Sequence, residues 1–186
     1  MQSYKDFLAE ILIDEDALQA RIKELGSEIS ADYTDGNLLL ICILRGGVSF
    51  LVDLSRHITS PHTMDFMAVS SYGAGRRESS GAVRVTLDLQ TDIRDRDVLL
   101  VEDIVDSGRT ISAVLEMLHL RKPRSLKVCT LLDKPERRQS DVTIHYRGFN
   151  IPNKFVFGYG LDLDEYYRNL RFIGVVDLDK YQPPSG

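Results

Sequence analysis

The sequence predicts an α/β protein built on a mostly parallel, doubly wound sheet that is flanked by helices. Two observations carry this prediction. Short apolar runs alternate along the chain with segments whose apolar residues recur every three or four positions, a pattern typical of strands covered by helices. Polar or glycine-containing junctions follow several of the apolar runs. Because ligands bind at the carboxyl ends of strands in such sheets, these junctions are where we expect the functional site.

In the first half of the chain, periodicity predicts two helices and three strands. Apolar residues spaced by four and three, after acidic residues that suit a first turn, predict a helix at 14–29. The unbroken apolar run 38–44 predicts a strand buried on both faces, and a helix is expected to follow it to about residue 57. Further strands are expected at 64–71 and, from the alternation of apolar and polar residues, at 83–89.

The second half continues the alternation of strands and helices. Short apolar runs predict strands at 98–101, 126–132, 155–158 and 173–176. Residues 111–120 predict a helix, which Lys122-Pro123 ends. Residues 137–146 are polar and irregular, and 162–168 are expected to form a helical turn.

Composition restricts the class of protein. The chain has 186 residues, 43% of them hydrophobic, which is enough for one domain with a core. A formal charge of -5 gives no bulk electrostatic reason to expect a nucleic-acid partner. The apolar run 38–44 is too short to span a membrane, and the N-terminus does not begin as a signal peptide. Cys42 and Cys129 are expected to be buried, reduced thiols. We therefore expect a cytoplasmic enzyme or regulator without a membrane partner.

Three polar junctions fall at the ends of predicted strands: Arg45-Gly46-Gly47, Glu102 to Thr110, and Asp133-Lys134. In the second, paired carboxylates suit ribose hydroxyls, and a Ser-Gly turn before a helix offers backbone amides to phosphate, so the stretch predicts a sugar-phosphate site. Plainer interpretations exist for single residues. Glu102 and Asp103 fit a solvated acidic pair, Asp106 a helix N-cap, and Lys134 a surface lysine.

The stretch from Val98 to Thr110 resembles the phosphoribosyl-diphosphate-binding motif of the type I phosphoribosyltransferases, with an apolar strand, two acids, two apolar residues, Asp, Ser, Gly, a variable residue and Thr. Further segments agree with the members that act on hypoxanthine and guanine, and the resemblance covers about 35–180. These segments are Leu44-Arg45-Gly46-Gly47, Ser71-Tyr72, Leu132-Asp133-Lys134, 151–162 and Glu165-Tyr166-Tyr167-Arg168.

The resemblance implies a single domain, 1–186, with a core at about 35–135 and a small irregular hood, formed by 155–180, that reads the purine. A flexible lid is implied at the polar, glycine-rich loop 72–81, opened by Ser71 and Tyr72. The implied reaction transfers the 5-phosphoribosyl group from its 1-diphosphate to N9 of a 6-oxopurine, giving IMP or GMP and pyrophosphate in purine salvage. Mg²⁺ is the implied cofactor, and a homodimer or homotetramer is the implied assembly.

The resemblance also implies a role for each matching residue. Asp106 is the implied general base, sited for the proton on purine N7. Glu102 and Asp103 are implied to bind the ribose hydroxyls. The residues implied to bind the 5′-phosphate are Asp106, Ser107, Gly108, Arg109 and Thr110. The pyrophosphate falls to Arg45, Gly46 and Arg168; the purine to Lys134, Phe155, Val156 and Asp162; and the metal to Glu102, Asp103 and Asp162. Many family members carry Lys where this chain has Arg109, and in relatives the peptide that corresponds to Leu44–Arg45 can be cis.

Single residues again allow other interpretations, because an aromatic such as Phe155 in a short apolar strand is more often part of the core. Two other functions also stay open. One is a regulator on the same fold that senses phosphoribosyl diphosphate and binds nucleic acid. The other is the same transfer to another base, such as xanthine, adenine or a pyrimidine.

Overall fold

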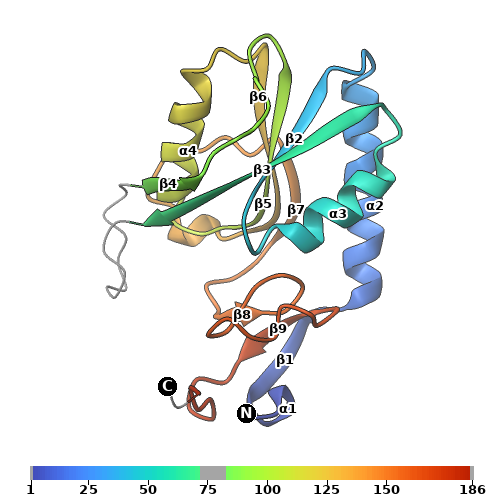
Figure 1. Cartoon of the computed structure of the whole chain (residues 1–186). Coiled ribbons are helices and arrows are strands. Elements are labelled where there is room, and N and C mark those ends of the chain that lie inside the picture. Colours follow the sequence, from blue (N-terminus) through green and yellow to red (C-terminus); the bar gives the residue numbers. More distant parts are fainter. Residues whose placement is uncertain (1, 72–82, 185–186) are drawn as a thin grey trace.

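Two sheets organise the chain in the computed structural model, which describes residues 2–71 and 83–184 (Figure 1). The larger sheet has six strands in the order β4-β3-β2-β5-β6-β7, and the smaller has three in the order β1-β9-β8. Tyr72 and the predicted loop 72–81 lie outside the described residues.

The large sheet is parallel except at one edge, as predicted. Its strands are β2 (Leu38–Ile43), β3 (His62–Ser71), β4 (Val83–Leu87), β5 (Asp97–Val105), β6 (Ser125–Asp133) and β7 (Tyr146–Asn150). Only the β3–β4 pair is antiparallel among the described strands of this sheet. The β2, β5 and β6 strands therefore all point their carboxyl ends toward the same edge.

Helices cover both faces of the large sheet. α2 (Glu15–Asp32) and α3 (Val48–His57) lie on one face and α4 (Arg109–His119) on the other (Figure 1). Alternate residues of β2 enter two separate cores: Leu40 packs with the α2 and α3 residues, and Ile41 with those of α4. Every residue of β2 is buried, which confirms the prediction of a strand buried on both faces.

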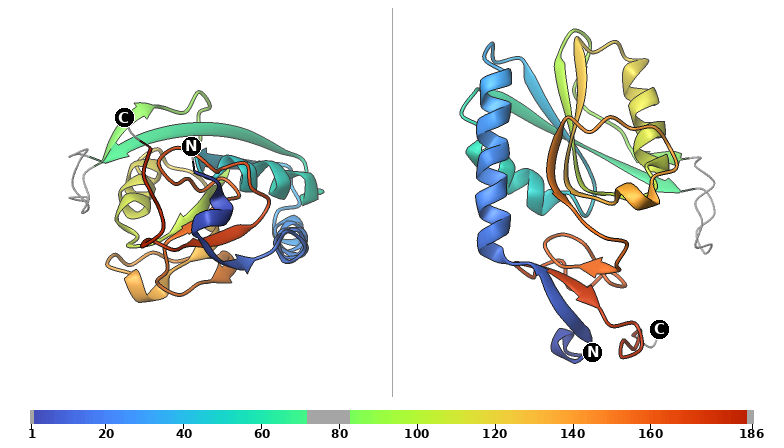
Figure 2. Two further views of the ribbon diagram at one scale, coloured as in Figure 1. Left: turned by 90° about the horizontal axis from the view of Figure 1, so that it is seen from below. Right: turned by 180° about the vertical axis from the view of Figure 1, so that it is seen from behind.

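The small sheet is made from both ends of the chain. It contains β1 (Leu8–Ile13), which follows the short helix α1 (Tyr4–Phe7), together with β8 (Val156–Phe157) and β9 (Ile173–Val176). Both termini lie at this end of the molecule, and α2 extends from the small sheet along the whole length of the large one (Figure 2). Its own core joins Phe7 and Phe157. Its strands β8 and β9 lie within the hood predicted at 155–180, whereas β1 comes from the N-terminus and was not expected there.

Two local predictions were wrong. Residues 162–168 do not form a helical turn: Leu163 and Tyr166 pair as an antiparallel bridge around Asp164 and Glu165, which have φ of 52° and 71°. Consecutive residues with positive φ reverse the chain tightly, as in a hairpin turn, and cannot continue a helix. The strand β7 was also missed, because Tyr-Arg-Gly-Phe-Asn does not alternate; its pairing with β6 forms it.

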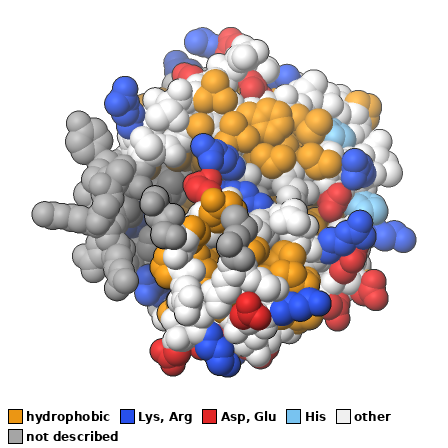
Figure 3. Space-filling model, turned by 60° about the horizontal axis from the view of Figure 1, so that its bottom comes forward, with side chains coloured by type: hydrophobic (Ala, Val, Ile, Leu, Met, Phe, Trp, Pro, Cys, Tyr) orange, Lys and Arg blue, Asp and Glu red, His pale blue; other side chains and the backbone are white. Residues whose placement is uncertain are grey.

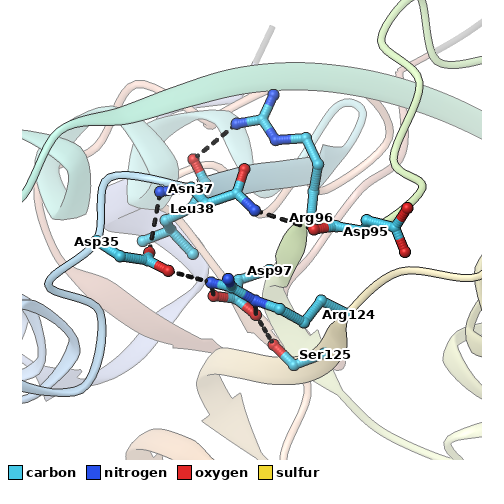
Figure 4. A network of polar contacts seen from close by, with 8 residues as sticks. All are labelled: Asp35, Asn37, Leu38, Asp95, Arg96, Asp97, Arg124 and Ser125. Atoms are coloured by element: carbon cyan, nitrogen blue, oxygen red, sulfur yellow. Dashed lines mark hydrogen bonds and ion pairs between the residues drawn. The ribbon is translucent and has the colours of Figure 1, made fainter.

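The amino edge of the large sheet is closed by a network of polar contacts (Figure 4). Arg124 Nε donates to Asp97 Oδ1 at 3.0 Å, and Ser125 Oγ donates to the same oxygen at 2.6 Å. The Arg124 Nη2 group also donates to Asp35 Oδ2 at 2.5 Å. These contacts tie the starts of β5 and β6 to the turn before β2.

Candidate active site

Four segments that are distant in sequence meet at the carboxyl edge of the large sheet. The β2–α3 loop packs against the end of β5, since a Cβ atom at Gly46 would lie 1.7 Å from Asp103 Oδ2. The segment after β8 packs on the same loop, since a Cβ atom at Gly160 would lie 2.1 Å from the Gly46 carbonyl oxygen. Close approach of this kind requires glycine at both positions. The end of β6 joins them, because Lys134 N donates to the Val105 carbonyl at 3.0 Å.

A cleft lies between the end of β5 and the start of α4. Its lining includes Glu102, Asp106, Ser107, Gly108 and Thr110. Gly108 is the N-cap of α4, with φ of 81° and no side-chain capping bond, so the interpretation of Asp106 as the N-cap is wrong. The first turn of a helix carries amide groups without intrahelical partners and the positive end of the dipole, so this end of α4 is suited to an anion in the cleft.

The paired acids of β5 are not a solvated pair. Glu102 is 9% exposed, and its Oε1 atom is buried with no hydrogen-bond partner. Burial, together with the neighbouring Asp103 carboxylate, raises the pKa of Glu102 well above its usual value. Burial also raises the pKa of Asp103 to about 6, although the amide of Ile104 donates to Asp103 Oδ1 at 2.8 Å and opposes the shift. The buried Glu102 Oε1 atom is therefore available to a hydrogen-bond donor or a cation that enters the cleft.

Asp106 is held between two cations that come from the end of β6. Arg137 Nε donates to Asp106 Oδ1 at 3.0 Å, and Lys134 Nζ lies 3.6 Å from Asp106 Oδ2. Lys134 is only 7% exposed, so the interpretation as a surface lysine is wrong. Burial lowers the pKa of Lys134, and the Asp106 carboxylate counteracts that shift. The amide of Gln139 donates to the Ser107 carbonyl at 2.9 Å, so the same segment also fixes the loop.

A second charged cluster lies where the small sheet faces the β2–α3 loop. Arg168 Nη1 donates to the Gly160 carbonyl at 2.9 Å, and Arg168 Nη2 lies 3.0 Å from Asp162 Oδ1 and 3.2 Å from Glu165 Oε2. Arg45 Nη1 donates to Glu165 Oε2 at 2.6 Å. The Leu44–Arg45 peptide is cis, as the resemblance implies.

The residue directly before β8 is the aromatic group predicted for the purine. Phe155 is 52% exposed, so it is not part of the core. Val156 is buried and pairs with Val175 in the small sheet. Figure 3, which brings the small sheet forward, shows basic and acidic side chains close together near the middle of the face in view, next to hydrophobic surface.

Comparison with known proteins decides the family. A family model described as a phosphoribosyl transferase domain matches residues 10–164. The chain belongs to the phosphoribosyltransferase family. A hypoxanthine-guanine phosphoribosyltransferase of Mycobacterium avium is 52% identical over 185 residues, covering 96% of this chain and 91% of the relative. A hypoxanthine phosphoribosyltransferase of Escherichia coli is 48% identical over 171 residues, covering 91% of this chain and 96% of the relative.

Solved structures of the phosphoribosyltransferase family match the fold. The crystal structure of a hypoxanthine phosphoribosyltransferase from Staphylococcus aureus has a TM-score of 0.92 and 43% identity, covering 98% of this chain and all of that one. A hypoxanthine-guanine phosphoribosyltransferase from Bacillus anthracis has a TM-score of 0.87 and 44% identity, covering 91% of this chain and 99% of that one. The α/β fold and the family predicted from the sequence are confirmed.

Within this phosphoribosyltransferase, the residues predicted for the phosphoribosyl half of the substrate and those predicted for pyrophosphate form two separate groups. Those expected to hold the ribose and the 5′-phosphate line or adjoin the cleft beside α4. Those expected to hold pyrophosphate belong to the second cluster. Ser71 ends β3, but its side chain is not described.

Within residues 2–71 and 83–184, no group of three or more His, Cys, Asp or Glu side chains is arranged to hold a metal ion. The helices described there are also too short or too polar to cross a membrane.

Two charged residues of this phosphoribosyltransferase were missed by the sequence prediction. Arg137 contacts the proposed general base, and Glu165 bridges the two arginines predicted for pyrophosphate. Both lie within three positions of a predicted site residue. The sequence signal that could have indicated them is a charged residue close to Lys134 or Arg168 that could pair with an oppositely charged site residue.

Proposed function

We propose that this chain transfers the 5-phosphoribosyl group from its 1-diphosphate to N9 of hypoxanthine or guanine in purine salvage. One observation carries the proposal. A buried carboxylate with an unpartnered oxygen, Glu102, lies in the same cleft as the start of α4, where the N-cap residue Gly108 offers no side-chain capping bond. That pair of features suits a substrate that has both sugar hydroxyls and a phosphate. Relatives whose sequences are 52% and 48% identical to this chain are named hypoxanthine-guanine and hypoxanthine phosphoribosyltransferases, which supports the same proposal.

In the proposed reaction, the phosphoribosyl half of the substrate binds in the cleft. Glu102 and Asp103 accept hydrogen bonds from the ribose 2′ and 3′ hydroxyls. The 5′-phosphate binds to the loop from Asp106 to Thr110, where Gly108 lets the backbone come close to the phosphate. The sugar carbon gains oxocarbenium character as the diphosphate leaves, so orientation and electrostatics supply the catalysis and no covalent nucleophile is needed.

The purine is proposed to bind between the end of β6 and the small sheet. Asp106 takes the proton from N7, and Lys134 donates to the exocyclic oxygen that marks a 6-oxopurine. Both groups are paired with each other in the free chain, so the base separates them as it binds. Phe155 stacks on the ring with its exposed face, and Val156 offers backbone groups to the base edge.

Mg²⁺ is the proposed cofactor, and the donor set suits it. Glu102 and Asp103 supply carboxylate oxygens, one of them buried without a partner, and Asp162 adds another from the small sheet. Mg²⁺ usually takes one or two carboxylates, with phosphate oxygens and water completing its shell. When bound, the ion neutralises charge on the leaving diphosphate. Arg45, Gly46 and Arg168 are proposed to contact that group directly.

Steady-state kinetics test this proposal. Phosphoribosyl diphosphate and Mg²⁺ are supplied with hypoxanthine, guanine, xanthine or adenine, and pyrophosphate release is measured. We expect release with hypoxanthine or guanine and little with adenine. Preference for another base would change the substrate. Absence of base-dependent release, with salt-sensitive binding of nucleic acid, would favour the regulator instead. The lid, the homodimer or homotetramer and the cytoplasmic location stay predictions.

A further inference from the structure

The arginines proposed for the diphosphate are already occupied in the free chain. Arg45 comes from the loop after β2, and Arg168 from the segment after β8. Both contact the same atom, Glu165 Oε2, at 2.6 Å and 3.2 Å. One carboxylate oxygen therefore bridges two guanidinium groups, as a phosphate oxygen of a diphosphate would.

The backbone of Glu165 is fixed, but its side chain is not confined. Glu165 N donates to Asp162 Oδ2 at 2.9 Å, and the flanking residues Leu163 and Tyr166 exchange two backbone hydrogen bonds of 3.1 Å. The buried side chain of Leu163 anchors this turn. The side chain of Glu165 is 65% exposed, so rotation about its own bonds takes the carboxylate away from both arginines. The Glu165 carboxylate is therefore an anion that can move while its backbone attachment stays in place.

The charges of the cluster cancel. Arg45 and Arg168 contribute two positive charges, and Asp162 and Glu165 two negative ones. A diphosphate that approaches this cluster meets little net attraction until Glu165 moves aside. Competition of this kind weakens binding of the leaving group and equally favours its departure after transfer.

We propose that Glu165 is an internal competitor of pyrophosphate. The Glu165 carboxylate binds Arg45 and Arg168 in the free enzyme and returns to them when pyrophosphate leaves. This inference rests on the proposed function, in which these arginines hold the diphosphate. Glu165 does not touch the reacting atoms; it controls how tightly the arginines hold the leaving group.

Calorimetric titration with inorganic pyrophosphate and Mg²⁺ tests the proposal on the full-length chain. Glu165→Gln keeps the size of the side chain and removes its charge. We expect the variant to bind pyrophosphate about three- to tenfold more tightly, the amount that two exposed ion pairs together supply. The KM for phosphoribosyl diphosphate should fall by a similar factor while the KM for the purine stays constant. Unchanged or weaker pyrophosphate binding would overturn the proposal.

Controls separate this effect from a general change of charge or folding. Glu24→Gln removes an equally exposed carboxylate that pairs with Arg21 at 2.7 Å on α2, and it should leave pyrophosphate binding unchanged. Glu165→Asn supplies a second neutral residue that tolerates positive φ, and it should bind pyrophosphate as tightly as Glu165→Gln. In an Arg45→Ala background the effect of Glu165→Gln should shrink, since one of its two ion pairs is already gone.

The proposed function and this inference fail in different ways. If the parent binds pyrophosphate, Arg168→Ala weakens that binding and Glu165→Gln leaves it unaltered, only the inference is overturned. If the parent neither binds pyrophosphate nor releases it in the presence of a purine, both are overturned.

Discussion

The strand β5 carries one buried acid at its first residue, Asp97, and another, Glu102, in the half nearer its carboxyl end, and the surroundings of the two carboxylates are opposite. At the amino edge, Asp97 accepts hydrogen bonds from Arg124 and Ser125, and the Arg124 guanidinium lowers the pKa of Asp97 (Figure 4). At the carboxyl edge, Glu102 has a buried oxygen without a partner, and burial raises its pKa. The exposed fractions are similar, 7% and 9%.

The difference separates an acid whose hydrogen bonds stabilise the fold from one that we propose binds a ligand. A saturated carboxylate contributes to stability, while a buried carboxylate without partners lowers the stability of the free protein. The same contrast holds on β6. Lys127, near its start, contacts Asp32 and Tyr146, whereas Lys134, just past its end, is buried beside the proposed general base. Variants at matched positions test this comparison.

The largest effect is expected at the carboxyl edge from Asp106→Asn. Loss of the general base should lower kcat about 10²- to 10⁴-fold. Binding of phosphoribosyl diphosphate should change little, because the loop amides and the α4 dipole are kept. Steady-state kinetics and calorimetry measure the two quantities. The control is Asp141→Asn, which makes the same substitution and the same loss of charge at a nearby exposed position. An unaltered kcat would mean that Asp106 has no part in proton transfer.

At the amino edge, Asp97→Asn should lower the free energy of unfolding by about 2 kcal/mol at neutral pH and leave the kinetics intact. Because the folded pKa of Asp97 lies below its ordinary value of 3.8, the stabilisation is present above that pH and is lost as pH falls further. The deficit of the variant should therefore shrink in acid. Urea denaturation at pH 7 and pH 3 measures both values.

Asp88→Asn is the matched control for that variant. Asp88 pairs with Arg121 at 2.8 Å, but its side chain is 54% exposed, so its loss should cost well under about 1 kcal/mol. A deficit for Asp97→Asn no larger than that of the control would remove the network at the amino edge from the list of stabilising features.

Just past the end of β6, Lys134→Ala should reduce the preference for hypoxanthine over adenine about tenfold or more, because the proposed donor to the exocyclic oxygen is lost. Lys127→Ala, near the start of β6 at the opposite edge of the sheet, should leave that preference unchanged. The ratio of kcat/KM for the two bases is the measurement. An equal ratio in both variants and the parent would exclude Lys134 from base recognition.

The smallest effect is expected from Glu102→Gln, and it should raise the stability of the protein, whereas Asp97→Asn should lower it. Removing the buried charge should raise the free energy of unfolding of the ligand-free chain by about 1 kcal/mol. Phosphoribosyl diphosphate should then stabilise the variant less than the parent. Thermal melting with and without that ligand measures both changes. A lower melting temperature of the ligand-free variant would show that Glu102 is satisfied in the free protein after all.

Features that are local in sequence could be predicted. The strand buried on both faces at 38–44 and the loop from Glu102 to Thr110 are each contained in one short stretch whose pattern follows from burial and from the helix terminus. The helix 14–29 was also predicted, and the structure extends it to Asp32.

Features that need a distant partner could not be predicted. Glu165 and Arg45 are 120 positions apart, and no pattern in either segment names the other. The strand β7 depends on β6 for its hydrogen bonds, and β1 pairs with β9 from the other end of the chain. The turn at Asp164 and Glu165 has positive φ without glycine, so its residue types give no signal.

The pairing of β1 with β9 also sets the order in which the protein is completed. Synthesis delivers β1 first and β9 nearly last, and β8 pairs only with β9 in the small sheet. The large sheet can assemble while the chain is still on the ribosome, since β2 to β7 precede residue 151. The surface proposed to stack on the purine, which includes Phe155 and Val156, must wait for the final strand. A nascent chain or a truncated product can therefore hold the proposed phosphoribosyl cleft and Lys134 without that stacking surface.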